Sequence, residues 1–290
     1  PVQIVKKNKQ KFIIGGAGNV AVNLVSIGIK CKLVSILGDD SSGRKINNII
    51  SEINNLDFKP LICNRITTKK TRVVVNGQQL LRIDDENTDN INEKDEYELI
   101  YIIREILKNN NIKLVVISDY NKGIITKSFF QKLIELCHKY KVSSFLDPKS
   151  KDFKKYSGVT LIKPNEKEAI DSCSFDLDEI SIQNDEQLIL VAKEINKSSH
   201  AKYVLITLSD QGAALIDIEN LKIYKAISDK IDVYDVTGAG DTFLSVFSYF
   251  YVNGLHLNKC LFLANKASSI SVSKRGNYVI TKEDIVSILK

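Results

Sequence analysis

A glycine-rich segment near the C-terminal end reads Asp235-Val236-Thr237-Gly238-Ala239-Gly240-Asp241-Thr242 and leads into an apolar run. Its glycines allow backbone N–H groups to converge at a helix N-terminus, an arrangement that binds phosphate oxygens. Asp241 would repel an anion held there, but it suits a base that takes a proton from an attacking hydroxyl. We therefore predict an anion hole formed by Gly238, Ala239 and Gly240, with Asp241 as the catalytic base. The alternative is a tight turn in which Asp241 only caps the helix.

A second glycine-rich segment, Gly15-Gly16-Ala17-Gly18-Asn19, precedes another helical pattern near the N-terminus. Alone, it would indicate no more than a tight turn before a helix. Together with Ala21, Gly28 and Gly38 it meets every spacing of the first signature of the ribokinase-like (PfkB) carbohydrate kinases, and the segment 235–241 matches the second. The two signatures stand in the family's order and lie more than two hundred residues apart. The chain therefore resembles this kinase family along nearly its whole length.

The hydrophobic pattern agrees with the fold of that family. Short apolar runs alternate with longer amphipathic ones, which predicts a parallel sheet covered by helices on both faces. Expected strands span 32–37, 113–118, 142–146, 159–162 and 203–206. Expected helices span 19–27, 41–53, 96–108, 127–140, 186–196, 240–253 and 256–273, with a short one from about 282. The resemblance implies an α/β fold of the ribokinase-like three-layer α/β/α type, with a mainly parallel central sheet, in one kinase domain over residues 1–290.

One segment breaks this alternation. Two apolar runs, 69–75 and 78–83, flank Asn76-Gly77, and this dipeptide is the strongest short signal for a β-hairpin. An isolated hairpin is barely stable in water, so its apolar side must be covered by something. We therefore predict a small β lid within residues 60–85, which also serves as the contact of a homodimer.

Three further segments narrow the resemblance to one branch of the family. The stretches Ser118–Gly123, Leu146–Lys149 and Gln78–Arg82 look like those of the heptose-7-phosphate kinases. This resemblance implies ATP-dependent phosphorylation of the anomeric hydroxyl of D-glycero-D-manno-heptose 7-phosphate, on the route to the activated heptose of surface polysaccharide. Two alternatives stay open: a family kinase for another sugar or sugar phosphate, such as ribose, fructose or a hexose phosphate, and a binding protein without turnover.

The resemblance also assigns the ATP side of the site. Asn165-Glu166-Lys167-Glu168 matches the NxxE motif, in which Glu168 is linked to Mg²⁺ through water, although an ordinary helix start with an Asn cap is the alternative. Asp235, with the carbonyls around Lys274 and Gly276, resembles a site for a monovalent cation such as K⁺. The remaining nucleotide-binding residues would be Thr207, Ser209 and Gly212 in one loop, where Ser209 replaces the usual glycine, and Asn265 beside the adenine.

Three groups of residues are expected at the sugar end. By resemblance, Gly15, Gly16 and Asn19 would face the sugar. A sugar phosphate needs cations, and candidates at strand ends or on the hairpin are Arg72, Arg82, Lys122 and Lys149. For each of these four the alternative is a solvated surface charge. Asp119 and Asp147 follow strand ends, where ligands of parallel sheets bind, and would contact sugar hydroxyls directly or through another residue.

The composition of the chain limits the kinds of partner that it is expected to bind. The chain has 290 residues with 41 basic and 35 acidic side chains, a formal net charge of +6. Because these charges interleave along the sequence, the mild excess does not indicate nucleic acid. No apolar run approaches the roughly 18 residues that span a bilayer, so we expect a small-molecule sugar phosphate as partner and no membrane. The five cysteines are dispersed without a CxxC pair, which is typical of reduced thiols in a cytoplasmic protein.

The N-terminal end departs from the family pattern. Family members begin with a strand that carries Gly-Asp, and an Asp just after it grips the sugar hydroxyls, whereas this sequence starts at Pro1-Val2-Gln3-Ile4-Val5. We therefore expect about 25–40 further N-terminal residues in the natural protein, the length of one strand and its loop. No HxGH motif of a nucleotidyltransferase is found in the sequence, so we expect kinase chemistry alone from these residues.

Overall fold

The structure is a computed structural model that describes residues 4, 6, 8–75, 78–109, 111–173, 182, 184–229 and 231–290. Its helices are α1 (Ala17–Ser26), α2 (Ser41–Ser51), α3 (Glu93–Asn109), α4 (Lys127–Lys139), α5 (Glu166–Asp171), α6 (Asp185–Ser199), α7 (Ala239–Val252), α8 (Leu257–Val272) and α9 (Lys282–Leu289). Its strands are β1 (Cys31–Gly38), β2 (Leu56–Cys63), β3 (Lys69–Val75), β4 (Gln78–Asp85), β5 (Leu114–Ser118), β6 (Ser143–Asp147), β7 (Leu161–Ile162), β8 (Tyr203–Thr207), β9 (Ala213–Asp217) and β10 (Lys222–Ala226). Each helix and strand expected from the sequence is present, within a few residues of its predicted ends.

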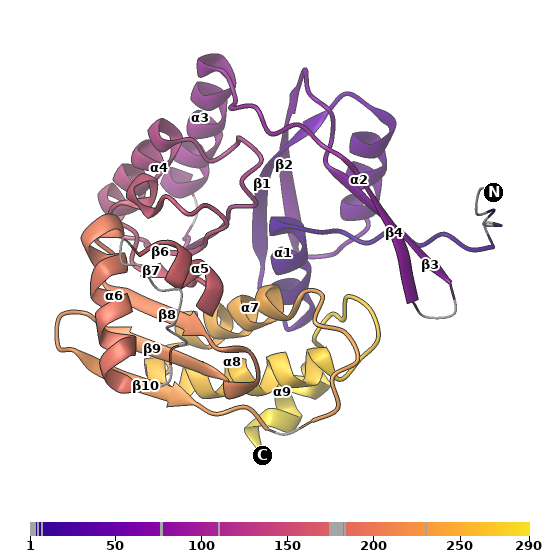
Figure 1. Ribbon diagram of the computed structural model, residues 1–290. Coiled ribbons are helices and arrows are strands. Elements are labelled where there is room, and N and C mark those ends of the chain that lie inside the picture. The colour runs from indigo at the N-terminus through magenta and orange to yellow at the C-terminus, as the bar shows by residue number, and fades with distance from the viewer. Residues whose placement is uncertain are drawn as a thin grey trace.

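The central sheet has six strands in the order β10-β9-β8-β7-β6-β5 (Figure 1). Strands β5 to β8 run parallel, as predicted. Strand β9 runs antiparallel to both β8 and β10, and this end of the sheet was not foreseen. Strands β1 and β2 form a separate parallel pair, packed beside α1, α2 and α3. The predicted α/β class with a mainly parallel central sheet is confirmed.

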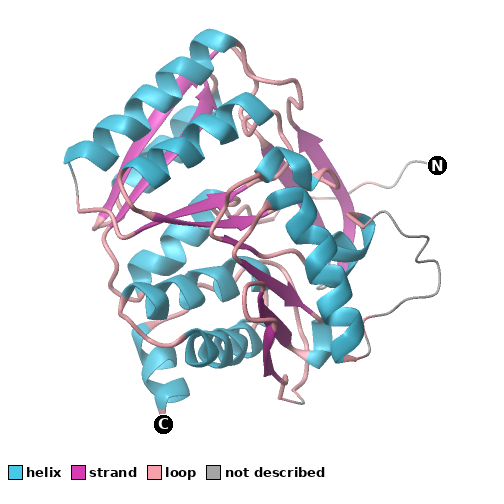
Figure 2. Cartoon of the chain, turned by 90° about the vertical axis from the view of Figure 1, so that its left-hand side faces the viewer, coloured by secondary structure: helices cyan, strands magenta, loops and turns pink. Residues whose placement is uncertain are grey.

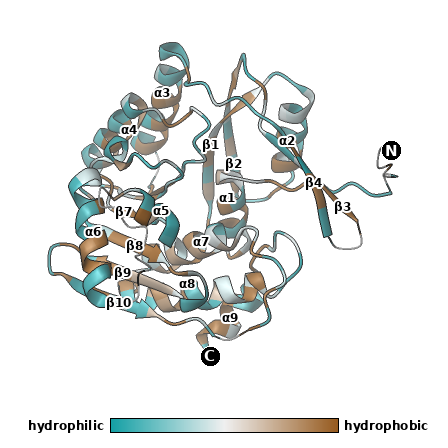
Figure 3. Ribbon diagram, viewed as in Figure 1, coloured by the Kyte–Doolittle hydropathy of each residue, from teal (hydrophilic) through white to brown (hydrophobic). Residues whose placement is uncertain are grey.

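The two faces of the sheet are covered by different helices (Figure 2). On one face, Ile162, Val204 and Ile216 belong to a buried cluster completed by α3, α4 and α6. On the other face, Leu161 and Leu205 pack in a second cluster with residues of α7, α8 and α9. Neighbouring strand residues point to opposite faces, so runs that are apolar throughout become buried on both sides. Figure 3 shows this pattern as hydrophobic strands between helices whose outer faces are hydrophilic.

The predicted hairpin is present as β3 and β4, which pair antiparallel and project from the body of the molecule (Figure 1). The turn at Asn76-Gly77 lies outside the described residues, while the flanking pair Val75 and Gln78 closes the ladder. Several large apolar side chains on the hairpin are exposed: Val74, Leu80, Leu81 and Ile83. The hairpin therefore carries an apolar surface that the described part of its own chain leaves open.

Four elements were missed in the sequence: strands β2, β9 and β10, and helix α5. Strand β2 contains Asp57, Lys59 and Pro60, which disguise its pattern, although Pro60 is accommodated opposite Ser35 of β1. Helix α5 has six residues, too few to show a helical period. No helix in the described part of the chain is long and apolar enough to cross a membrane.

Candidate active site

The site forms where the two glycine-rich segments meet. Asn19, in the first turns of α1, donates from its side-chain amide to Asp241 Oδ2 of α7 at 2.6 Å, across 222 positions of sequence. Asn277 donates in turn to Asn19 Oδ1 at 2.8 Å. Asn19 and Asp241 are 2% and 6% exposed. The structure thus brings both predicted motifs into one buried hydrogen-bonded group.

Asp241 points into this group and does not cap its helix. The N-cap residue of α7 is Gly238, and no side chain caps this helix end. Besides the bond from Asn19, the carboxylate accepts a hydrogen bond from the Tyr120 hydroxyl, at 3.2 Å to Oδ1. Burial raises the pKa of Asp241 above its ordinary value, while the bond from Asn19 opposes the rise. This geometry excludes the alternative in which Asp241 serves only as a cap.

The first turn of α7 has the backbone geometry expected of an anion hole. Gly238 has φ 82°, in the left-handed region, and a Cβ there would overlap Asn277 Oδ1. The N–H of Ala239 donates to Val236 O at 3.2 Å, so this amide is already used. Among the described residues, the N–H groups of Gly240 and Asp241 bond to no acceptor outside the helix. These two amides are therefore the ones available to an anion.

The floor below Gly240 consists of charged side chains from the ends of neighbouring strands. Lys163, directly after β7, places Nζ 3.3 Å from Asp147 Oδ2 at the end of β6. Lys149 Nζ lies 3.7 Å from Asp147 Oδ1 and 2.6 Å from Glu168 Oε1 of α5. Although burial opposes it, the carboxylates of Asp147 and Glu168 raise the pKa of Lys149. The predicted residues Asp147, Lys149 and Glu168 therefore form one cluster.

Three residues of this site were not assigned from the sequence: Tyr120, Lys163 and Asn277. A signal for Lys163 was present, because a lysine directly after the apolar pair Leu161-Ile162 stands at the same sheet edge as the predicted carboxylates. Tyr120 lies between the predicted residues Asp119 and Lys122, but no feature of the sequence distinguishes it as a site residue. Asn277 had no local signal, since only the fold brings it to Asn19.

Asp147 and Glu168 are the residues to test for Mg²⁺, the ion that accompanies ATP in this chemistry. Asp147 Oδ1 is buried and accepts no hydrogen bond, and an unsatisfied carboxylate oxygen of this kind suits a hard cation. The described residues contain no ready cluster of three or more metal-ligating side chains. That fits Mg²⁺, which is commonly held by one or two carboxylates together with phosphate oxygens. The residues present fit the ion.

The predicted nucleotide residues converge on the adjoining strand ends. Asn165 and Glu168 form a capping box on α5, so the ordinary helix start considered for this motif is present, and Glu168 additionally holds Lys149. Thr207 ends β8 and bridges to Asn165. Ser209 has φ 52°, in the left-handed region, which explains why glycine is common there in the family. A Cβ at Gly212 would overlap Ala226 O, so this position requires glycine.

Two further predicted residues lie beyond that loop. Asn265 of α8 is buried and donates to Ile227 O at 3.1 Å. A cavity of about 260 Å³ is lined in part by Lys266, the next residue of α8, although Asn265 itself does not line it. Asp235 accepts hydrogen bonds from the N–H groups of Thr237 and Gly276, at 2.9 and 3.2 Å, and the bonds from Thr237 lower its pKa. The structure therefore joins Asp235 to the 274–276 segment, as the cation-site expectation requires.

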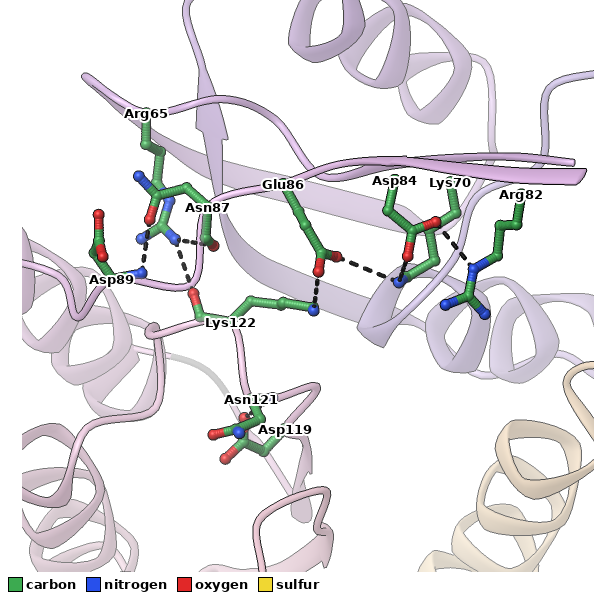
Figure 4. A network of polar contacts seen from close by, with 10 residues as sticks. All are labelled: Arg65, Lys70, Arg82, Asp84, Glu86, Asn87, Asp89, Asp119, Asn121 and Lys122. Carbon is green, nitrogen blue, oxygen red and sulfur yellow. Dashed lines mark hydrogen bonds and ion pairs between the residues drawn. The ribbon is translucent and has the colours of Figure 1, made fainter.

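The basic residues predicted for the sugar phosphate differ in how much of their charge is already neutralised, and Figure 4 shows two of them, Arg82 and Lys122, with their acidic neighbours. Lys122 pairs with Glu86, and Arg82 lies 3.1 Å from Asp84 on the same strand. Arg72 stands directly across the hairpin from Arg82, and two like charges opposite each other repel. No ion pair of Arg72 is found among the described residues. Among the described residues, the charge of this arginine pair is therefore neutralised only in part, by the pairing of Arg82 with Asp84.

Asp119 is placed differently from the other predicted carboxylates. It is 2% exposed, accepts from the Tyr156 hydroxyl at 2.6 Å, and pairs with Lys155 at 2.7 Å. Its second oxygen accepts from the N–H of Asn121, which shapes the loop after β5. Its contacts therefore position that loop, which carries Tyr120 and Lys122, and direct contact with a sugar stays a prediction.

Comparison with known proteins agrees with this site. The model of the pfkB family carbohydrate kinases matches residues 1–283. The chain is 35% identical over 287 residues to the bifunctional protein HldE of Aliarcobacter butzleri, covering 98% of the chain and 58% of that protein. With the Campylobacter jejuni protein of the same name, it is 38% identical over 288 residues, covering 99% and 59%. The chain thus spans less than two thirds of the length of these relatives.

Solved structures show the same fold at low sequence identity. Phosphofructokinase-2 of Escherichia coli, solved in complex with potassium, matches with a TM-score of 0.77 at 18% identity, covering 99% of this chain and 92% of that one. Ribokinase of Thermotoga maritima matches with a TM-score of 0.72 at 20% identity, covering 97% and 91%. The predicted ribokinase-like fold is confirmed. By its family match and its relatives, the chain belongs to the pfkB family of ATP-dependent carbohydrate kinases.

Proposed function

We propose that this kinase phosphorylates the anomeric hydroxyl of D-glycero-D-manno-heptose 7-phosphate, giving the 1,7-bisphosphate in the cytoplasm on the route to surface polysaccharide. Resemblance of three segments to the heptose-7-phosphate kinases supports this sugar, and the relatives named bifunctional protein HldE agree with it. One observation carries the reaction: Asp241 is buried, is held by Asn19 and Tyr120, and lies beside free amides at a helix N-terminus.

The chemistry follows from that arrangement. Asp241 takes the proton of the anomeric hydroxyl while the oxygen of that hydroxyl bonds to the γ-phosphorus of ATP. The bond between this phosphorus and the oxygen of the leaving ADP breaks in the same step. The N–H groups of Gly240 and Asp241 donate to the oxygens of the phosphoryl group. Asn19 and Tyr120 fix the direction of the carboxylate. Mg²⁺, held by Asp147 and Glu168, would neutralise phosphate charge.

The proposed nucleotide site lies between the loop after β8 and helix α8. Thr207, Ser209 and Gly212 would line the phosphate and ribose side, with Asn165 at its edge. Asn265 would lie by the adenine, and the cavity lined by Lys266 and Ser269 of the same helix is a candidate space for it. Asp235 would bind a monovalent cation such as K⁺, an assignment that agrees with the potassium complex of the Escherichia coli neighbour.

At the sugar end, Gly15 and Gly16 would approach the ring of the sugar. The aromatic ring of Tyr120 would close one side of this position, because it lies 3.8 Å from a Cβ placed on Gly16. Arg72 and Arg82 would bind the 7-phosphate, because one dianion relieves the repulsion between both guanidinium groups. Lys122 would join them by exchanging Glu86 for the phosphate.

A panel of sugars and sugar phosphates, with coupled detection of ADP, tests the proposal. The expected result is turnover with D-glycero-D-manno-heptose 7-phosphate at a kcat/KM above that for ribose, fructose and the hexose phosphates. A higher value for another sugar would replace the heptose by that sugar. Absence of turnover across the panel, with sugar or nucleotide still bound, would show a binding protein without activity.

We also propose a homodimer formed through the lid. Its exposed Leu80, Leu81 and Ile83 would pack against the same surface of a second copy, which is the isologous contact common in dimers. Light scattering of the native chain should give twice the monomer mass, and Leu81→Asp should give the monomer. A monomeric native chain at micromolar concentration contradicts the proposal.

A further inference from the structure

Lys163 is a buried lysine that the sequence motifs do not assign. Its side chain is 3% exposed and follows the last residue of β7. Its ammonium lies 3.3 Å from Asp147 Oδ2, and a Cβ placed on Gly240 would lie 3.6 Å from the same ammonium. The charge is therefore directed at the glycine loop where we place the transferred phosphoryl group.

A second lysine–aspartate pair at the same sheet edge differs from the pair of Lys163 and Asp147 in how many hydrogen bonds its carboxylate accepts. At the end of β5, Asp119 pairs with Lys155 and also accepts from Tyr156 and from the N–H of Asn121, so that pair is fully used. Beside Lys163, in contrast, Asp147 is 4% exposed and keeps a buried oxygen, Oδ1, that accepts no hydrogen bond and has the Lys149 ammonium only at 3.7 Å. A buried polar group left unsatisfied in this way indicates that a ligand completes the cluster.

We propose that Lys163 is a catalytic residue whose ammonium binds the γ-phosphoryl group of ATP and remains on it during transfer, with Asp147 holding the ammonium in place. The proposal rests on the kinase chemistry proposed above, which puts the phosphoryl group at Gly240, but it does not depend on the identity of the sugar.

Electrostatics supports a functional charge at this place. Burying an ammonium and a carboxylate is costly, and a buried ion pair is often no more stabilising than apolar residues of similar size. A charge fixed in a water-poor site next to a reacting group is, however, strongly effective, because it needs no reorganisation as the charge moves. Lys163 meets that condition, since its partner Asp147 and its burial fix the ammonium in advance.

Nucleotide binding gives the first test, measured by calorimetry with Mg²⁺ present. Lys163→Met should weaken the non-hydrolysable ATP analogue AMP-PNP about 10- to 100-fold, the loss expected for one hydrogen-bonded charge, while ADP affinity changes less than about threefold. The matched control is Lys155→Met, which removes the neighbouring pair and should change both nucleotides equally. Equal losses for AMP-PNP and ADP in Lys163→Met would overturn the proposal. Because no sugar is needed, this result is independent of the heptose assignment.

A double variant separates catalysis from simple neutralisation of Asp147. If Lys163 only balances that carboxylate, the uncharged pair Lys163→Met with Asp147→Asn should be as active as Asp147→Asn alone. If Lys163 binds the phosphoryl group, kcat of the double variant should lie a further 10²-fold or so below Asp147→Asn, although its melting temperature matches. The assay uses whichever sugar the panel selects. Lys163→Arg should recover part of kcat, and equal activity of the two Asp147→Asn proteins would refute the proposal.

Discussion

Helices α5 and α7 both begin with a carboxylate in their first turn, and the structure uses the two carboxylates in opposite ways. On α5, Asn165 and Glu168 bond to each other's backbone in a capping box, so the helix end is satisfied by its own residues. On α7, no side chain caps the end, and Asp241 instead bonds to Asn19 and Tyr120. The satisfied end stabilises the fold, whereas the open end is available to a ligand.

The difference arises from residues far away in the sequence. The first turns of α5 and α7 were each compatible with a simple cap, because an acidic residue there is favourable at any helix N-terminus. The hydrogen-bond partner of the carboxylate determines which role it has. Asn19 stands 222 positions from Asp241 and reaches it only because α1 packs on α7. Local sequence therefore marks the candidate residue, and the tertiary contact determines its role.

Replacing the α7 carboxylate gives the largest expected effect. Asp241→Asn should lower kcat by about 10²- to 10⁴-fold, the range for loss of a general base, and should leave ADP affinity within about twofold. Coupled ADP detection and calorimetry measure the two quantities. An Asn variant that kept most of its activity would show that Asp241 is not the base.

The same variant should differ from the native chain in how stability depends on pH. Burial raises the folded-state pKa of Asp241, so the folded chain favours the protonated carboxyl and loses stability as pH rises through that value. The neutral Asn avoids this loss. Asp241→Asn should therefore melt higher than the native chain at pH 7, with a difference that vanishes below about pH 4, where the unfolded Asp is also protonated. A lower melting temperature at pH 7 would contradict this sign.

The backbone of the open end gives the second effect. Gly238→Ala must adopt φ 82° and overlaps Asn277 Oδ1, so it should cost about 1–3 kcal/mol of unfolding free energy and also reduce kcat, because Asn277 holds Asn19. Gly254, at the other end of α7, is a matched control with the same φ of 82° and no atom within 4 Å. Gly254→Ala should cost about 1 kcal/mol by urea denaturation and leave kcat unchanged. Equal losses in both variants would argue against a special role for Gly238.

Much of the fold was predictable because its signal is local. The runs at 142–146 and 203–206 are apolar throughout, which is what strands covered on both faces require. Strand β2 was not predicted because Pro60 and charged residues interrupt its pattern. Strands β9 and β10, which form the antiparallel end of the sheet, were not predicted either.

The site was predictable where a motif concentrates its residues. Gly238 to Asp241 are contiguous, so one segment indicates both an anion hole and a base. Lys163 and Asn277 belong to no such motif, and their roles come from side-chain contacts across the fold, to Asp147 and to Asn19. The sequence also provides four basic side chains as candidates for binding one phosphate. Only the structure distinguishes them, because it shows which of the four already pair with acidic neighbours.

Removing the N-cap of helix α5 should lower the stability of the fold more than the rate of the reaction. Asn165→Ala should cost about 1 kcal/mol, the usual value for an N-cap, because the N–H of Glu168 loses its acceptor. It should lower kcat several-fold, since the first turn that carries the Glu168 carboxylate is then held less firmly. Asn184→Ala on α6 removes an N-cap bond of similar length, in which Asn184 accepts from the N–H of Gln187, and Asn184 is not among the residues proposed for the nucleotide. It should lower stability by a similar amount in urea denaturation and leave kcat unchanged. A loss of kcat in both variants would mean that the α5 cap has no particular link to catalysis.

The smallest effect concerns the hydroxyl that holds Asp241 from the other side. Tyr120→Phe removes a 3.2 Å hydrogen bond that stabilises the ionised carboxylate, so the pKa of Asp241 should rise further. The acid limb of kcat/KM should then move to higher pH, with a few-fold loss on that limb and none well above it, as for one neutral hydrogen bond. Tyr156→Phe, which removes a 2.6 Å bond to the buried Asp119, is the control that should lower stability without moving the limb. The groups around Asp241 act together on this limb: Asn19 and Lys163 lower its pKa as Tyr120 does, and Asp147 raises it. An unmoved limb in Tyr120→Phe would leave Asn19 as the residue that sets the direction of the base.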